Sequence, residues 1–294
     1  MGAGMTEEEK KLTRRRFYKA EQEASFADAK QHITPQTQSP SYRLAFRDTD
    51  FLLREELRPV RFQLELLKPE MLLEEAGVGS TLVVYGSARI PSPEHVEAVR
   101  ATATTPERKA VVERLIANSK YYEEARKLGR IASSCAVVEN GMRQFVVCSG
   151  GGPSIMEAAN RGAADVGAES IGLNIVLPHE QAPNDFVTPD LSFQFHYFAL
   201  RKLHFLLRAR AVAVFPGGFG TLDELFELLT LIQTGKMKPI PVLLFGRDHW
   251  NRIINFEALA DEGVINHNDI ELFDWVETAE EAWAKIVRFY ELDC

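Results

Sequence analysis

The chain has 294 residues, 45% of them hydrophobic and 26% charged, so it can bury a sizeable core and still carry an appendage. Its formal net charge of −8 argues against generic binding to a long nucleic acid, which needs a basic surface. No apolar run reaches the length of a membrane span, and the N-terminus lacks the apolar core of a signal peptide.

Cysteine usage points to a reducing compartment. The three cysteines, Cys135, Cys148 and Cys294, have neither the number nor the spacing of a disulfide framework or a zinc site. We therefore expect a cytoplasmic protein that holds no metal.

Residues 1–75 are predicted to form a charged N-terminal arm followed by a helical extension. The stretch 6–30 is strongly charged, and the proline-bearing polar segment 34–41 reads as a linker. The segment 51–77 then shows an interrupted helical apolar pattern, and we interpret it as packing material because no grouping in it suggests chemistry.

The first core strand is predicted at 81–85, where TLVVY runs into the turn GSAR. A polar insertion with one or two helices is expected at 91–120, followed by a crossover helix at 121–138 and a second strand at 144–148. A crossover of this kind implies parallel pairing of the strands. Three glycines, 150–152, follow the second strand and precede a helix.

A third strand is predicted at 170–177, and the loop after it contains His179 and Glu180. Residues 191–210 are expected to contain the next long helix, with Phe195 and Phe198 on its apolar face and the string FALRKLHF within it. Further strands are predicted at 211–215 and 241–246, and an edge strand at 270–276. Alternating strands and helices with glycine turns at the strand ends predict a doubly wound α/β fold, Rossmann-like, over residues 76–294.

The strand at 211–215 leads into PGGFGTLDE. Gly217, Gly218 and Gly220 permit positive φ and close backbone approach, so that amide N–H groups at the helix start are expected to converge on an anion such as phosphate. A purely structural alternative is that Thr221 and Glu224 form a capping box for the same helix.

The string PGGFGTLDE resembles the PGGxGTxxE signature of the Lonely Guy (LOG) family of nucleotide-activating phosphoribohydrolases, long misnamed lysine decarboxylases. The string GGGPSIMEAANRGA is similar to the family's GGGxxGxM segment, except that Ser154 replaces the usual glycine. FALRKLHF resembles the family's RK pair, at Arg201 and Lys202. The motifs occur in family order, from about residue 82 to residue 290.

This resemblance implies hydrolysis of the N-glycosidic bond of a nucleoside 5′-monophosphate, a cytokinin ribotide or AMP, to the free base and ribose 5-phosphate. It implies Arg201 and Glu224 as catalytic residues, no cofactor, and a homo-oligomer of at least two chains. The implied substrate contacts are Ser87, Arg89, Gly151, Gly152, Glu180, Lys202, Gly217, Gly218, Gly220 and Thr221. The alternative is a non-hydrolytic nucleotide sensor or carrier on the same fold.

Overall fold

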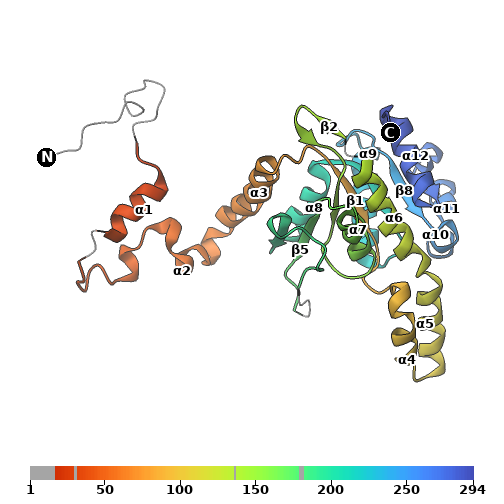
Figure 1. Ribbon diagram of the computed structural model, residues 1–294, viewed down its shortest axis with the longest axis horizontal. Coiled ribbons are helices and arrows are strands. Elements are labelled where there is room, and N and C mark those ends of the chain that lie inside the picture. Colours follow the sequence, from red (N-terminus) through yellow and green to blue (C-terminus); the bar gives the residue numbers. More distant parts are fainter. Residues whose placement is uncertain (1–16, 30–31, 136, 179–181) are drawn as a thin grey trace. The chain divides into compact units, whose positions relative to one another are not determined.

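The computed structural model describes residues 17–29, 32–135, 137–178 and 182–294 (Figure 1). Contacts within the chain divide it into two units, Met1–Arg61 and Phe62–Cys294, so the division falls inside helix α3 (Arg58–Glu75). The first unit contains α1 (Ala20–Ala29), α2 (Thr49–Leu52) and the short 3₁₀-helices η1 (Pro40–Tyr42), η2 (Ala45–Arg47) and η3 (Glu55–Leu57).

The second unit is built on a seven-stranded parallel sheet. Its strands are β1 (Thr81–Tyr85), β4 (Val146–Ser149), β5 (Ile171–Ile175), β6 (Ser192–Phe195), β7 (Ala209–Val214), β8 (Val242–Phe245) and β9 (Asp274–Val276), in the order β6-β5-β4-β1-β7-β8-β9. Strands β2 (Val138–Glu139) and β3 (Met142–Arg143) form a separate antiparallel hairpin. The doubly wound α/β prediction is confirmed.

Helices cover both faces of the sheet, which explains the continuous apolar runs of the central strands. On one face, α6 (Lys120–Cys135), α7 (Ile155–Ala164) and α12 (Ala279–Tyr290) pack over Leu82 and Val84. On the other face, α8 (Phe198–Leu207), α9 (Phe219–Gln233), α10 (Arg247–Ile253) and α11 (Phe256–Asp261) pack over Val83 and Tyr85. The remaining elements are η4 (Pro93–His95), α4 (Val96–Ala101), α5 (Pro106–Ala117), η5 (Pro189–Leu191) and η6 (His267–Leu272). As predicted, α4 and α5 form an insertion, which projects away from the sheet (Figure 1).

The helix predicted within 191–210 is present as α8, but Phe195, expected on its apolar face, lies in strand β6. Phe193 and Phe195 are buried on one face of this strand, whereas Ser192 and Gln194 lie on the other. This alternation with period two is typical of a strand, and the segment pairs with β5 in the sheet. Helix α8 starts only at Phe198.

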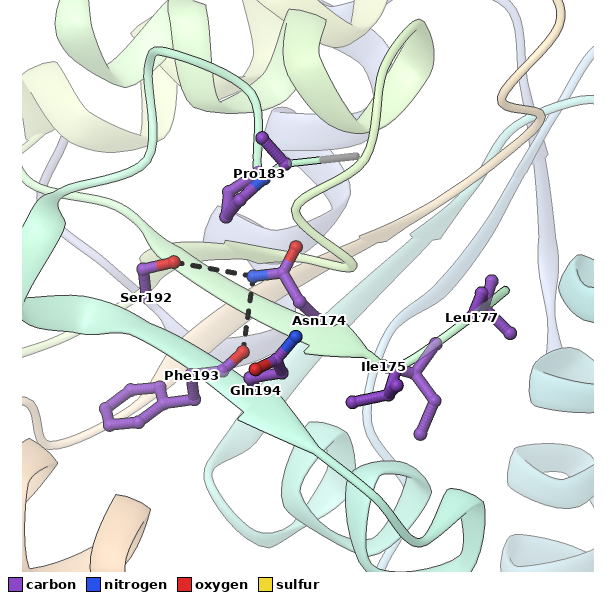
Figure 2. A pocket seen from close by; sticks show the side chains of 9 residues that line it. Asn174, Ile175, Leu177, Pro183, Ser192, Phe193 and Gln194 are labelled. Atoms are coloured by element: carbon purple, nitrogen blue, oxygen red, sulfur yellow. Dashed lines mark hydrogen bonds between the residues drawn. The ribbon is translucent and has the colours of Figure 1, made fainter. Parts of the chain in front are cut away.

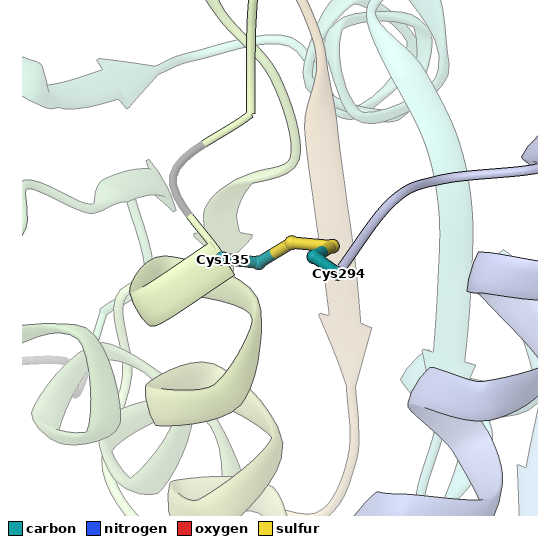
Figure 3. Close-up of a disulfide and its surroundings, with 2 residues drawn as sticks. All are labelled: Cys135 and Cys294. Atoms are coloured by element: carbon teal, nitrogen blue, oxygen red, sulfur yellow. A yellow bond between two sulfur atoms is a disulfide. The ribbon is translucent and has the colours of Figure 1, made fainter.

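Two of the cysteines form a disulfide, although their number and spacing indicate no disulfide framework. Cys135, the last residue of α6, is joined to Cys294 by a disulfide (Figure 3). Their Cα atoms lie 6.0 Å apart although 159 positions separate them in the sequence. Spacing cannot reveal such a pair, because the packing of α12 on α6 brings the two cysteines together. Cys148 is free and buried.

Among the described residues, no helix is long and apolar enough to span a membrane.

Candidate functional site

Three turns meet at the carboxyl edge of the sheet, at the point where the strand order reverses between β1 and β7. The backbone N–H of Ser87 donates to Pro216 O at 3.0 Å, and that of Ile155 donates to Ser87 O at 3.4 Å. The turns after β1, β4 and β7 are therefore tied to one another. In open α/β sheets this crevice is where ligands bind.

Arg201 and Glu224 form a largely buried ion pair at this edge. The guanidinium Nη1 of Arg201 lies 3.5 Å from Glu224 Oε1, and the two side chains are only 12% and 13% exposed. Arg201 is held from below, because its Nε donates to the carbonyl of Leu173 at 2.6 Å. A Cβ added to Gly150 would lie 2.6 Å from the guanidinium, so a side chain there would displace Arg201. The folded chain thus brings together the two residues predicted to be catalytic.

Burial raises the pKa of Glu224 to about 7, although the neighbouring charge of Arg201 works in the opposite direction. Tyr85 and Cys148 are buried beneath the pair, and burial also raises the pKa of the Cys148 thiol. A carboxyl group whose pKa lies near neutrality in a crevice is typical of functional sites.

The glycine turn after β7 differs from the prediction in its backbone. Gly217, Gly218 and Gly220 all avoid positive φ. Gly217 is needed for packing, since an added Cβ would lie 2.1 Å from Thr221 Oγ1, whereas Cβ atoms at Gly218 and Gly220 would meet open space. The turn therefore leaves room for a ligand at the start of α9.

The capping-box alternative for Thr221 and Glu224 is wrong. Helix α9 starts at Phe219, its N-cap is Gly218, and no side chain caps it. Thr221 is already the third helical residue, so Glu224 lies one turn too far along to close a box. The uncapped N–H groups of this 15-residue helix are available to an anion.

The triple-glycine turn after β4 is fixed by a buried polar network. Gly151 has φ of +72°, and its amide donates to Ser149 Oγ. The Ser149 hydroxyl donates to Oδ1 of the fully buried Asn160, at 2.7 Å. Asn184 closes the network, because the two hydrogens of its Nδ2 are shared among Gly151 O, Gly152 O and Asn160 Oδ1, which lie 3.0–3.1 Å away.

Ser154, where the family has glycine, has φ of +67° and stands at the N-cap of α7. Few residues other than glycine adopt this conformation. The buried Ser154 hydroxyl donates to Ile90 O at 2.5 Å, a bond that glycine lacks.

The remaining predicted substrate contacts have surroundings unlike those of the ion pair and the glycine turns. Lys202 Nζ lies 3.0 Å from both Asp223 and Glu227. Burial alone would lower the pKa of Lys202, but its hydrogen bonds to these carboxylates raise it instead. The Ser87 hydroxyl accepts the backbone N–H of Arg89, whose exposed side chain has no partner among the described residues. Glu180 lies outside the described residues.

Sequence reasoning missed Asn160, Asn174 and Asn184. Asn174 left a signal, since it is a polar residue inside the otherwise apolar strand IGLNI. Asn160 and Asn184 left none, because their role depends on partners that only the fold brings together. Within the described part of the chain, no three His, Cys, Asp or Glu residues are grouped as metal ligands.

Fold and site together define a doubly wound α/β protein in which Arg201, Glu224 and two glycine turns lie at the carboxyl edge of the sheet, the edge where such folds bind ligands. The family model described as possible lysine decarboxylase matches residues 156–286. The chain is also 28% identical over 149 residues to the cytokinin riboside 5′-monophosphate phosphoribohydrolase LOG4 of Arabidopsis thaliana, covering 49% of this chain and 67% of that protein. These matches confirm the resemblance to the LOG family.

A second relative is the pyrimidine/purine nucleotide 5′-monophosphate nucleosidase of Escherichia coli K12, 29% identical over 145 residues. That match covers 44% of this chain and 28% of the nucleosidase, so the chain spans under a third of that relative's length. Among solved structures, the molybdenum cofactor carrier protein of Chlamydomonas reinhardtii is 18% identical, with a TM-score of 0.42 over 72% of this chain and 99% of that one. This last likeness carries no inference about function.

Proposed function

We propose that the protein hydrolyses the N-glycosidic bond of a nucleoside 5′-monophosphate, such as AMP or a cytokinin ribotide, to the free base and ribose 5-phosphate. The observation that carries this proposal is the buried pair Arg201–Glu224 beside an open helix N-terminus. The names of the two curated relatives support the same reaction class.

The 5′-phosphate is placed at the start of α9, where Gly218 and Gly220 leave the backbone open. The anomeric carbon then lies near Glu224. As the bond to the base breaks, positive charge develops on the sugar, and the Glu224 carboxylate stabilises it or takes a proton from the attacking water. Water supplies the hydroxyl of ribose 5-phosphate, and the base leaves with a proton.

A pKa of about 7 suits Glu224 to proton transfer at neutral pH. Arg201 does not give up its proton, so its role is to orient Glu224 and the sugar or phosphate of the ligand. The group that protonates the leaving base is not assigned.

Decarboxylation, which the name of the matched model suggests, is disfavoured. A Schiff-base lysine must lose its proton, and Lys202 is held as a cation by Asp223 and Glu227. Lys202 is instead proposed as a contact for the substrate, along with Ser87, Arg89, Gly151, Gly152, Glu180, Gly217, Gly218, Gly220 and Thr221.

The test is a comparison of single variants. Glu224→Gln is expected to reduce turnover by about two orders of magnitude or more while nucleotide binding persists, and Arg201→Ala is expected to be comparably inactive. Asp223→Asn, which changes the adjacent and more exposed carboxylate, serves as the matched control and should keep most of the turnover. Near-normal turnover in Glu224→Gln would refute the catalytic assignment.

The alternative from the sequence, a sensor or carrier, predicts tight nucleotide binding and no base release even by the wild-type protein. The homo-oligomer also stays a prediction, and light scattering that finds a compact monomer would contradict it.

A further inference from the structure

A cavity of about 290 Å³ lies at the carboxyl end of β5, beside Ser192, Phe193 and Gln194 of β6. Asn174, Ser192 and Gln194 supply its polar lining, and its apolar lining includes Ile175, Leu177 and Pro183 (Figure 2). The volume is at the small end of the range for small-molecule sites, which suits one part of a ligand rather than the whole.

The orientation of the Asn174 side chain is fixed by the backbone. Its Nδ2 lies 3.4 Å from Gly172 O and 3.2 Å from Phe193 O, and 3.4 Å from the Ser192 hydroxyl. Main-chain carbonyls only accept hydrogen bonds, so the NH₂ group must face them and Oδ1 must point away (Figure 2).

The Oδ1 atom of Asn174 is therefore a preoriented acceptor. The residue is 8% exposed, and no described residue donates to this oxygen. It lies against the triple-glycine turn, since a Cβ added to Gly151 would be 2.4 Å from it. A ligand N–H group that enters the cavity can therefore donate to an acceptor whose direction is already set.

The cavity continues the line of the proposed site. The edge runs from β7, which leads to the anion site, through β1 and β4 to β5. In the middle, Arg201 lies against Gly150 and bonds to Leu173 O. The residue after Leu173, Asn174, lines the cavity and lies against Gly151. A nucleotide with its phosphate at α9 and its sugar at Glu224 extends its base across the glycine turn towards β5.

We propose that this cavity holds the base of the nucleotide and that Asn174 Oδ1 accepts a hydrogen bond from the amino group at C6 of adenine or C4 of cytosine. The inference rests on the proposed function and narrows its substrate class to nucleotides of adenine and cytosine. Hypoxanthine and uracil present a carbonyl oxygen at the corresponding position, so two acceptors would face each other.

The first test needs only the wild-type protein. The kcat/KM for AMP is expected to exceed that for IMP by about tenfold or more, and CMP should be preferred to UMP in the same way. Equal values within each pair would overturn the proposal.

The second test uses Asn174→Ala, which should bring the AMP and IMP values to within about twofold of each other. The matched control is Asn251→Ala, an exposed asparagine on α10, which should keep the wild-type preference. Binding of ribose 5-phosphate, which does not reach the cavity, should be equal in all three proteins and reports that the rest of the site is intact. A wild-type preference that survives in a folded Asn174→Ala protein would overturn the proposal.

Failure of the proposed function is distinguishable from failure of this inference. If no nucleotide is hydrolysed, the hydrolase proposal fails, and calorimetric Kd values for AMP and IMP still test Asn174. If the nucleotides are hydrolysed without preference, only the inference about Asn174 fails. If Asn174→Ala does not fold, the wild-type ratios decide.

Discussion

Glu224 is a carboxyl group placed where its ionisation costs free energy. Burial raises its folded-state pKa from the ordinary 4.5 to about 7, so its contribution to stability is fully present below pH 4.5 and is lost as the pH rises through about 7. The glutamine of Glu224→Gln does not ionise, so the variant should not lose this stability as the pH rises. The free energy of unfolding of the variant minus that of the wild type should therefore be about 1–3 kcal/mol larger at pH 8 than at pH 5. Urea unfolding at the two pH values measures this. If the difference in free energy of unfolding between variant and wild type is the same at both pH values, Glu224 does not titrate near neutrality.

Ser154 has a strained positive φ, which destabilises the fold, and a side-chain hydrogen bond, which stabilises it. Ser154→Ala keeps the positive φ but loses the bond to Ile90 O, and we expect a loss of about 1–2 kcal/mol. Ser154→Gly also loses the bond, but it relieves the strain and should be the more stable of the two.

The control is Ser119, a buried serine that donates to Pro91 O without a positive φ. At that position glycine should be no more stable than alanine. The same ranking at both positions in thermal unfolding would remove strain as the explanation for Ser154.

At the scale of elements, the triple-glycine turn depends on the amide of Asn184. Asn184→Asp has the same shape but sets a carboxylate against the oxygens of Gly151, Gly152 and Asn160. Asn184→Asp should therefore lower the free energy of unfolding by about 1–3 kcal/mol, which is more than Asn184→Ala lowers it. It should also raise KM for the nucleotide. Asp185→Ala, an exposed neighbour, is the control for both. Equal melting temperatures for the Asp and Ala variants would argue against the network.

The sequence allowed the central strands to be predicted because burial on both faces demands continuous apolar runs, as in TLVVY. Strand β6 was not predicted, because it lies at the edge of the sheet, where Phe193 and Phe195 alternate with polar residues, and because helix α8 follows it directly. In the site, motif order singled out Arg201 and Glu224. It did not show that Lys202 turns to Asp223 and Glu227, since ion pairs between helices depend on the packing of α8 on α9.

For the whole molecule, the disulfide between Cys135 and Cys294 closes a loop of 159 residues. Closing a long loop restricts the unfolded chain, so Cys294→Ser should lower the free energy of unfolding by about 2–5 kcal/mol. Reductant should lower the melting temperature of the wild type to that of the variant, and the double variant with Cys135→Ser should match the single one. A wild type indifferent to reductant would show that the bond does not contribute.

The carboxyl edge of the sheet also organises the molecule's chemistry. Helices α8 and α9 lie on the same face of the sheet, and this places Arg201 and Glu224 in contact although 22 residues lie between them in the sequence. The turns after β1 and β4 complete the crevice from neighbouring strands. The fold therefore places an uncapped helix N-terminus and a largely buried carboxyl group close together.

The most direct test of the central claim is to incubate the wild-type protein with AMP and, in parallel, with adenosine, and to measure released adenine by chromatography. The account predicts adenine and ribose 5-phosphate in equal amounts from AMP and little release from adenosine, because the start of α9 is suited to the phosphate. Equal turnover of AMP and adenosine, or binding of AMP without any release of base, would contradict it.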